Sequence, residues 1–482
     1  MINYLPPLLV YLAYGVSGLT AVAGTFVIKD QLGLGPEALA AVGFWAGIPW
    51  ALKMPMGHIV DIYWKYKGWL VVLGATLMAA SLGIMLAIVS GSVTSSADSL
   101  FVLSAILAPT GYVIQDVVAD AMTVDAVPLT EPDGTPRPEA DIKAGHNTMQ
   151  TLGRMAVVSG GLGVALANVL LFHNVASEDM QATYVLVYQL ALAIPIVSVL
   201  GVALHAVLHR GSTPSTSTKA DTRILGGSAA YVAVVLAVGL SGFAYSQELV
   251  FVLSMAIVVA LVGVLIRELP PESRKTLIVT AALIWVFRAM PTNGAGAGWW
   301  QIDVLGFDQE FMAQLGLIGG ALALIGMVLL RAWMGRQSIT RVVVYLSVFG
   351  GLLSIPLVGM FYGLHHWTAG LTGGLVDARF IAVVDTALES PFGQLAMIPL
   401  LAWIANNAPA HLKATYFATM SALSNLALSA SALGTRYLSL AFPVSRGSYD
   451  ELGGHMVVVS VVVVVVPLLA ALLASRAIKK AA

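Results

Sequence analysis

Long apolar segments recur along almost the whole chain, and they constrain its fold more than any other feature. Of its 482 residues, 58% are hydrophobic and only 10% are charged, whereas a soluble protein carries about 25% charged residues. This composition excludes a soluble enzyme, and the formal net charge of −1 excludes a nucleic-acid binder, which needs a basic face. Because the apolar runs are long and unbroken, the sequence predicts an all-α polytopic membrane protein rather than a β-barrel.

The apolar runs divide into sets. At about 20 residues per span, they predict about 14 transmembrane helices, near residues 5–28, 36–60, 68–90, 99–127, 146–172, 182–208, 225–245, 248–267, 276–299, 309–333, 341–363, 379–405, 412–440 and 455–476. The polar segment after the sixth run has the composition of a flexible linker. We therefore predict an N-terminal six-helix bundle over 1–208, a cytoplasmic linker over 209–224, an inserted transmembrane helix pair over 225–267 and a C-terminal six-helix bundle over 268–482.

Basic residues outside the predicted spans fall almost entirely on one side. With a cytoplasmic N-terminus, only Lys29 and Arg446 lie in segments on the opposite side. Since an excess of Lys and Arg marks the cytoplasmic side, we predict that both termini are cytoplasmic. The first apolar run lacks a basic leader and a cleavage-site pattern, so it is interpreted as a span and not as a signal peptide. The lack of a transit peptide favours the bacterial inner (plasma) membrane.

The two six-helix sets share a motif. Shifting the chain by 273 residues aligns residues 30–37 (DQLGLGPE) with residues 303–310 (DVLGFDQE), at the point where an outer loop enters the next helix. Helices of equal polarity in the two copies predict a parallel repeat. This is the arrangement of major facilitator transporters, which bind substrate at the midplane between two halves.

An acidic pair lies in the fourth helix of each set. Asp116 and Asp120 are four residues apart and share one helix face, and the pair recurs as Asp385 and Glu389. An ionisable group inside a span costs about 2.5–3.5 kcal/mol on insertion scales and usually faces a cavity or a partner. These acids are candidates for the proton-coupling carboxylate. Arg154 comes at a similar depth to Asp120, so an Asp120–Arg154 ion pair is also expected.

A basic residue in the second set precedes a predicted break in its helix. Arg288 is followed by Pro291 and by the glycine-rich run 292–298, and both proline and glycine weaken a helix. Transporters use such breaks to offer backbone groups to a substrate. The buried charges therefore either line a transport path or form fixed ion pairs that hold the bundle closed. Arg379 and Arg436, near outer helix ends, are interpreted as snorkelling cations.

Aromatic residues offer two interpretations. Trp45, Trp50 and Tyr112 lie well inside their spans and could stack on a flat ring, or they could serve only as packing. Trp299 and Trp300 lie near a predicted interface and are interpreted as part of an aromatic belt.

Signals for catalysis are weak. The histidines are scattered, cysteine is absent, and no G-x-x-x-x-G-K-[ST] motif supports nucleotide binding. We predict that the chain is not an enzyme and holds no cofactor and no metal.

Five blocks of sequence resemble the folate–biopterin transporter family of the major facilitator superfamily. They occur in family order in both halves: 26–40 with 49–57, 115–127, 145–163, 287–294 with 304–320, and 408–434. In addition, Gly57, Asp61 and Lys65 resemble the G-x-x-x-D-[RK] loop of major facilitators, which implies a conformational-switch loop. The resemblance implies that the critical residues are Asp61, Asp116, Asp120, Arg154, Arg288, Glu389 and Asn425.

The resemblance implies a secondary transporter that moves a folate- or pterin-like solute by alternating access, coupled to protons. A folate would suit Arg154 and Arg288, which could clamp its two carboxylates, whereas a cationic solute would suit the four acids. The family also contains carriers of S-adenosylmethionine, and the loop after Asp61 is less basic than is usual in the family. Two alternatives therefore stay open: a major-facilitator transporter of another organic solute, such as S-adenosylmethionine, and a non-transporting membrane scaffold. The predicted partners are the small-molecule substrate, protons and the lipid bilayer, with no nucleic acid, and the sequence leaves the oligomeric state open.

Overall fold

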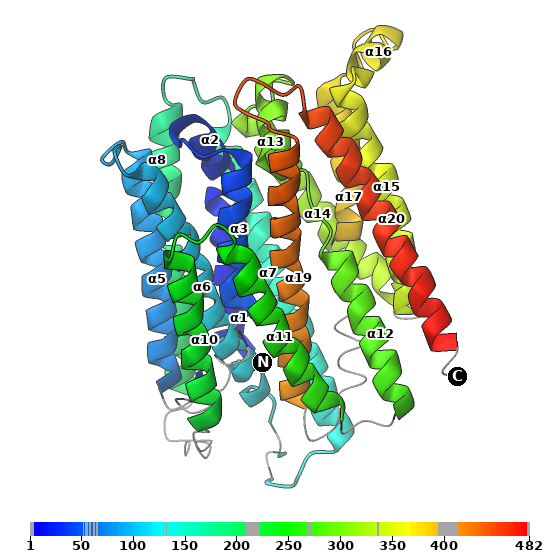
Figure 1. Cartoon of the computed structure of the whole chain (residues 1–482). Coiled ribbons are helices and arrows are strands. Elements are labelled where there is room, and N and C mark those ends of the chain that lie inside the picture. The colour runs from blue at the N-terminus through cyan, green and yellow to red at the C-terminus, as the bar shows by residue number, and fades with distance from the viewer. Residues whose placement is uncertain are drawn as a thin grey trace. The chain divides into compact units, whose positions relative to one another are not determined.

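Within the described residues, each predicted span overlaps one helix or consecutive helices (Figure 1). The computed structural model describes the chain except residues 1–3, 52, 54–55, 57–58, 61–62, 64–65, 129, 132, 209–221, 268–270, 335–336, 394–412 and 480–482. The described residues form helices and connecting loops, with only isolated bridges in place of strands. This confirms the all-α prediction.

The helices form two compact units, and each unit combines two segments that are not consecutive in the sequence. The first unit consists of Met1–Leu32 and Pro55–Val232, and the second of Gly33–Met54 and Ala233–Ala482. The second predicted span therefore packs with the second unit although its neighbours in sequence belong to the first. The four segments predicted from the sequence follow chain order, and their boundaries stay predictions.

The first unit is built mainly by three helix contacts, α5 with α6, α1 with α7, and α1 with α9. Its first span bends through a short 3₁₀ segment, η2, between α1 and α2. The helices are α1 (Leu5–Val16), η2 (Ser17–Thr20), α2 (Ala21–Gln31), α5 (Lys67–Val89), α6 (Ala97–Asp125), α7 (Glu139–Phe172), α8 (Met180–Ala191) and α9 (Ile194–Leu208), and α10 (Thr222–Leu240) begins here and ends in the second unit.

In the second unit, α3 packs against α19, α15 against α20, and α14 against α17. The inserted helix α11 also packs against α19. The helices are α3 (Pro36–Ala51), α11 (Ser246–Ile266), α12 (Pro271–Arg288), α13 (Gly294–Asp303), α14 (Gln309–Met334), α15 (Ile339–Phe361), α16 (Leu364–Leu371), α17 (Ala378–Gly393), α19 (Lys413–Ala441) and α20 (Leu452–Lys479).

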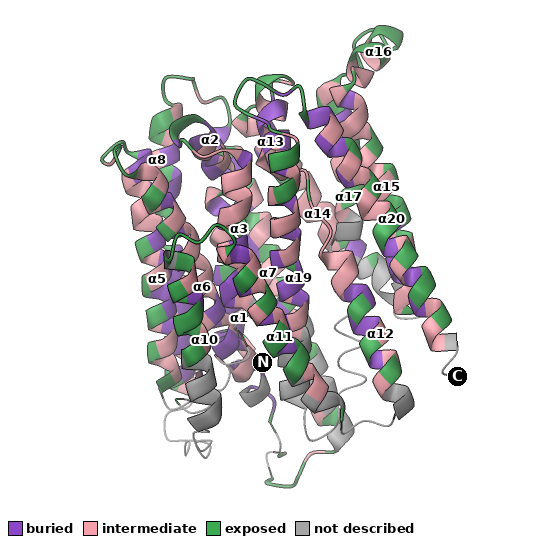
Figure 2. Cartoon of the chain, in the orientation of Figure 1, coloured by how far each residue is buried: buried purple, intermediate pink, exposed green. Residues whose placement is uncertain are grey.

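Exposed residues occur along the length of the helices (Figure 2). Many of them are large apolar side chains, as a lipid-facing surface requires. Leu170 and Leu329, for example, are 69% and 70% exposed. Within the described residues, eight helical segments are long and apolar enough to cross a membrane: Leu5–Gln31, Lys67–Val89, Ala97–Thr123, Leu152–Phe172, Met180–Leu208, Gln309–Gly326, Ile339–Phe361 and Leu452–Ile478. The chain is therefore an integral membrane protein, and the count of about 14 spans stays a prediction.

Small residues set the distance between α5 and α6. A Cβ atom on Gly74 would lie 2.7 Å from the carbonyl oxygen of Gly111, and one on Gly111 would lie 2.5 Å from that of Gly74. Ser81 of α5 and Ser104 of α6 also join the two helices, because their buried hydroxyls are hydrogen-bonded at 2.8 Å. Glycine permits this approach because it has no side chain, so close helix packing accounts for these glycines.

Trp299 and Trp300 correct a prediction. Both rings are almost fully buried, at 2% and 3% exposure, in an apolar cluster of the second unit that includes Met360 and Leu452. The interpretation of these residues as an aromatic belt is wrong, because α13 turns them toward the other helices of the unit.

Candidate substrate pathway

The first unit holds its acidic pair beside a tyrosine. Asp116 and Asp120 are half-buried on α6, and the hydroxyl of Tyr11 on α1 donates a 2.5 Å hydrogen bond to Oδ1 of Asp120. Tyr11 is buried with Val10 and Ala119, which fixes its ring against α6. The carboxylate is therefore held by a neutral donor.

Arg154 lies near the same tyrosine. Its side chain is exposed on α7, and it acts electrostatically on Tyr11. Its ion pair with Asp120 stays a prediction, and in this structure Tyr11 is a donor to Asp120. Sequence reasoning missed Tyr11 because a tyrosine in an apolar run is not distinctive until its partner is known.

The break after Arg288 is confirmed. Helix α12 ends at Arg288 and α13 begins at Gly294, so residues 289–293 leave helical geometry. Arg288 is half-buried, and its Nε donates to the carbonyl oxygen of Ser424 on α19 at 3.3 Å. The predicted basic group therefore stands at the break, next to α19.

The backbone groups at the break are bound by side chains of the protein. Ser431 donates to the carbonyl oxygen of Met290 at 2.6 Å, and the amide of Thr292 donates to the Thr435 hydroxyl at 2.9 Å. The carbonyl oxygen of Thr292 lies 3.3 Å from Nε2 of His455. In this structure α19 and α20 bind these three backbone groups, and the expectation that the break offers backbone groups to a substrate stays a prediction.

The α19 residues at the break form a polar stripe that sequence reasoning missed. Ser431 and Thr435 are four residues apart, which places them on one face of a helix. Their hydroxyls contact the break, as the bonds above show. This periodicity of small hydroxyls inside an apolar helix was the available signal.

The second acidic pair lacks the donor that the first has. Asp385 is half-buried on α17, and its Oδ1 is buried with no hydrogen-bond partner in the described part of the chain. Glu389, one turn further along, is exposed and close enough to interact electrostatically with Asp385. The next residue, Ser390, faces Gly319 of α14, where an added Cβ would lie 3.0 Å from its hydroxyl.

Asn425, Trp45 and Tyr112 each contact a neighbouring helix. Asn425 donates to the carbonyl oxygen of Trp50 at 3.3 Å. The Trp45 ring covers Gly239 of α10, where an added Cβ would lie 3.2 Å from it, so Trp45 serves packing in this structure. Tyr112 makes an edge-to-face contact with Tyr14, with centroids 5.4 Å apart.

Gly57, Asp61 and Lys65, the residues of the predicted switch loop, lie outside the described residues.

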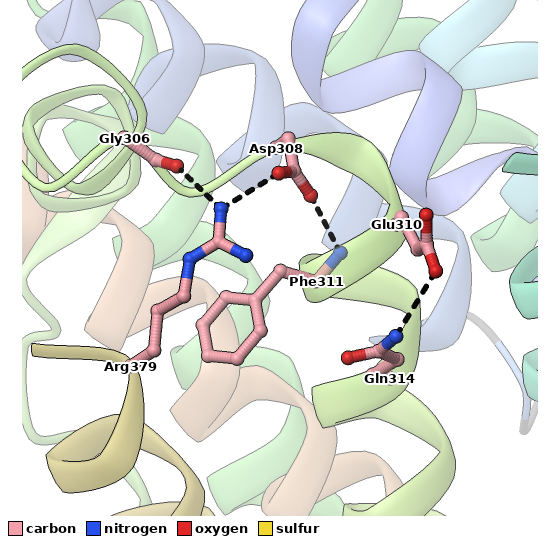
Figure 3. A network of polar contacts seen from close by, with 6 residues as sticks. All are labelled: Gly306, Asp308, Glu310, Phe311, Gln314 and Arg379. Carbon is pink, nitrogen blue, oxygen red and sulfur yellow. Dashed lines mark hydrogen bonds and ion pairs between the residues drawn. The ribbon is translucent and has the colours of Figure 1, made fainter. Parts of the chain in front are cut away.

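The second copy of the repeated motif forms a polar network at the start of α14 (Figure 3). Asp308 accepts from the Phe311 amide at 2.8 Å and pairs with Arg379 of α17, with Nη2 2.7 Å from Oδ2. Arg379 also donates to the Gly306 carbonyl oxygen at 3.1 Å and lies over the Phe311 ring. Nearby, Gln314 donates to Glu310 at 3.2 Å.

Arg379 and Arg436 are thus paired cations. Arg436 of α19 forms its ion pair with Glu248 of α11, 3.5 Å from Nη1 to Oε1. Snorkelling alone was the wrong account for both, because acids that are distant in sequence approach them only in the folded chain.

The start of the motif is held by a tyrosine. The Tyr449 hydroxyl donates to Oδ2 of Asp303. Burial, together with this bond to a carboxylate, raises the pKa of Tyr449 to about 12. The hydroxyl therefore keeps its proton at physiological pH and remains a donor.

Comparison with known proteins decides the family. The BT1 family profile matches residues 14–482. The chain belongs to the BT1 family.

Among the described residues, no group of three or more His, Asp or Glu side chains could hold a metal ion.

A curated relative supports the same assignment. The folate–biopterin transporter of Synechocystis sp. (strain ATCC 27184 / PCC 6803 / Kazusa) is 22% identical over 422 residues, which cover 87% of this chain and 71% of the relative. The BT1 chain is therefore a membrane transporter of the folate–biopterin transporter type.

Solved structures show the fold. Two structures of a POT family transporter, in complex with a thioalcohol-conjugated peptide and with 5-aminolevulinic acid, both have TM-scores of 0.68 at 14% and 15% identity. Each comparison covers 99% of this chain and 96% of the other. A peptide transporter POT in complex with sulfate has a TM-score of 0.61 at 19% identity, over 99% of this chain and 95% of that one. The fold is that of the major facilitator superfamily, as predicted.

Proposed function

We propose that this BT1 transporter moves a folate- or pterin-like organic solute by alternating access, driven by protons. The name of the Synechocystis relative supports the substrate class. The parallel repeat supports the mechanism, because loops 30–37 and 303–310 both lead directly into a helix, α3 and α14, at equivalent points of the chain.

The single observation that carries the coupling is the environment of Asp385. Its buried Oδ1 has no donor among the described residues, and a buried carboxylate without hydrogen bonds is costly when ionised. The acid next to it, Glu389, adds a like charge. A group that can hold a proton and then release it when its surroundings change is what a proton-driven transporter needs.

Arg288 supports an anionic solute. It is the basic side chain at the helix break, and a guanidinium presents several donors in a planar fork that matches a carboxylate. The glutamate part of a folate carries such carboxylates.

Uptake into proteoliposomes tests the proposal. A gradient of about one pH unit supplies about 1.4 kcal/mol per proton, a factor of about ten in accumulation. We expect folic acid or biopterin to accumulate when the gradient is imposed and not when a protonophore removes it. Absence of uptake of both compounds would refute the substrate class, and uptake indifferent to the gradient would refute the coupling.

A second solute class has one observation in its favour. Asp116, Asp120, Asp385 and Glu389 outnumber the basic groups in the same spans, so a cationic solute such as S-adenosylmethionine is the alternative. Competition decides between them: excess S-adenosylmethionine leaves folic acid uptake unchanged if the first proposal holds.

We also propose that both termini face the cytoplasm of a bacterial inner membrane. The chain has no cysteine, so a single thiol introduced by Asp450→Cys, in the exposed loop before α20, reports its side. A membrane-impermeant maleimide added to intact cells should label it, and labelling only after lysis would reverse the orientation.

A further inference from the structure

The inserted helix α11 is fastened to α19 along an apolar face. Val258 of α11 is buried against Ala422 and Leu426 of α19. Phe251, two turns earlier on α11, lies against the Trp285 ring of α12, with centroids 6.4 Å apart. Burial of this kind stabilises helix pairs without directional bonds, so α11 follows α19 as one body.

An ion pair strengthens the attachment where α11 begins. Oε1 of Glu248 lies 3.5 Å from Nη1 of Arg436 and accepts from the Tyr437 hydroxyl. Both charged side chains are only about a quarter exposed, at 24% and 25%. Screening by solvent is weaker there than at an open surface, so the pair adds a specific contact between α11 and α19.

Gln247, the residue before Glu248, contacts a different helix, α3. Gln247 is buried, 6% exposed, and its Nε2 donates to the carbonyl oxygen of Ala41 on α3 at 3.4 Å. At the end of α10, Gly239 lies under the Trp45 ring of α3. Two adjacent residues of the inserted pair therefore contact two helices, α3 through Gln247 and α19 through Glu248.

These two helices come from different parts of the chain. By sequence, α3 belongs to the predicted N-terminal bundle and α19 to the predicted C-terminal bundle, and in this structure they pack closely. In a transporter with two moving halves, helices of opposite halves that meet at one end must separate when that end opens.

We propose that the inserted pair is a conformational clamp, with Gln247 and Glu248 as positioning residues that hold α3 against α19. The clamp stabilises the state in which this end is closed, and breaking it shifts the population toward the open state. The inference rests on the proposed alternating access and adds a role for the helix pair, which a passive lipid-facing insertion would not have.

Cross-linking tests the clamp directly, because the chain contains no cysteine of its own. The double variant Ala41→Cys/Gln247→Cys, joined by a short bis-methanethiosulfonate linker, should stop folic acid uptake, and a reductant should restore it. The control is Val258→Cys/Ala422→Cys, which joins α11 to α19. Since these two helices move together, its cross-link should leave uptake unchanged. If the first cross-link leaves uptake intact, the clamp does not exist.

A second measurement needs no substrate. The thiol introduced by Ala41→Cys becomes more accessible to maleimide when α3 leaves α11. Adding Gln247→Leu, which removes the side chain that bonds the Ala41 carbonyl oxygen, should raise the labelling rate about three- to tenfold, within the range of mutations that bias a two-state element. Glu248→Asp, which keeps the charge, and Glu451→Gln, which neutralises an exposed acid of a nearby loop, should leave the rate as it is. Equal rates in all variants would overturn the proposal.

Failure of folic acid uptake in the wild type would instead refute the substrate class and leave this measurement valid.

Discussion

The two acidic pairs have the same spacing in sequence and opposite surroundings. In the first unit, Asp120 accepts a hydrogen bond from the buried Tyr11. In the second, the buried oxygen of Asp385 has no donor among the described residues. Repetition of a motif therefore does not repeat its chemistry: the donor comes from another helix, and within the described part of the chain the first unit supplies one to Asp120 while the second supplies none to this Asp385 oxygen.

The two copies of the loop motif differ in the same way. In the first copy Asp30 pairs with its neighbour Lys29 at 3.1 Å, and α3 begins at Pro36, a residue suited to a helix start. In the second copy Asp308 caps α14 and reaches Arg379 of α17. Gly35 stands where the second copy has Asp308, so this ion pair is particular to the second copy.

The largest expected effect comes from removing the acid without a donor. Asp385→Asn should lower gradient-driven folic acid uptake about 100-fold, within the range of typical coupling free energies. Exchange of folic acid without a gradient should persist, because it needs no net proton movement. The control Asp450→Asn neutralises an exposed loop acid and should transport normally. Equal loss of uptake and exchange would mean that Asp385 is only structural.

Breaking the hydrogen bond between Tyr11 and Asp120 in the first unit should mainly lower the stability of the fold. Its effect on proton coupling should be smaller. A hydrogen bond to a charged group contributes about 1.5–3 kcal/mol, so Tyr11→Phe should lower the Tm in detergent. Asp120→Asn acts on the same bond, and the double variant should lose less than the sum of the two single ones. Additive losses would show that the two side chains act independently.

The ion pair of the second loop should contribute less. Arg379 and Asp308 are 47% and 50% exposed, and exposed pairs contribute about 0.2–1 kcal/mol. Arg379→Gln should cause a small fall in Tm that shrinks at high salt, because ions screen the exposed pair. A fall of equal size at low and high salt would point to lost packing on Phe311 instead.

The smallest effect is expected at Glu389. It is exposed, and a like charge one helical turn away acts on its neighbour by about 0.2–0.5 kcal/mol. Glu389→Gln should therefore change uptake about twofold. A loss as large as that of Asp385→Asn would make the two acids a single proton site.

The sequence alone determined the class of the protein. Length and hydropathy placed each span on a helix, because lipid leaves the backbone few alternatives to a helix. Pro291 and the glycines after it predicted the break behind Arg288, since these residues weaken helices wherever they stand. The motifs also led to the family that the profile match shows.

Only the tertiary structure decided the partners of the charged groups. Tyr11, Ser431, Thr435 and Glu248 acquire their roles from residues more than 100 positions away. Chain order likewise assigned α3 to the first bundle, whereas its packing joins it to the second unit. Helix formation depends on neighbouring residues, whereas a hydrogen bond between helices depends on which faces meet, and packing of the whole chain sets those faces.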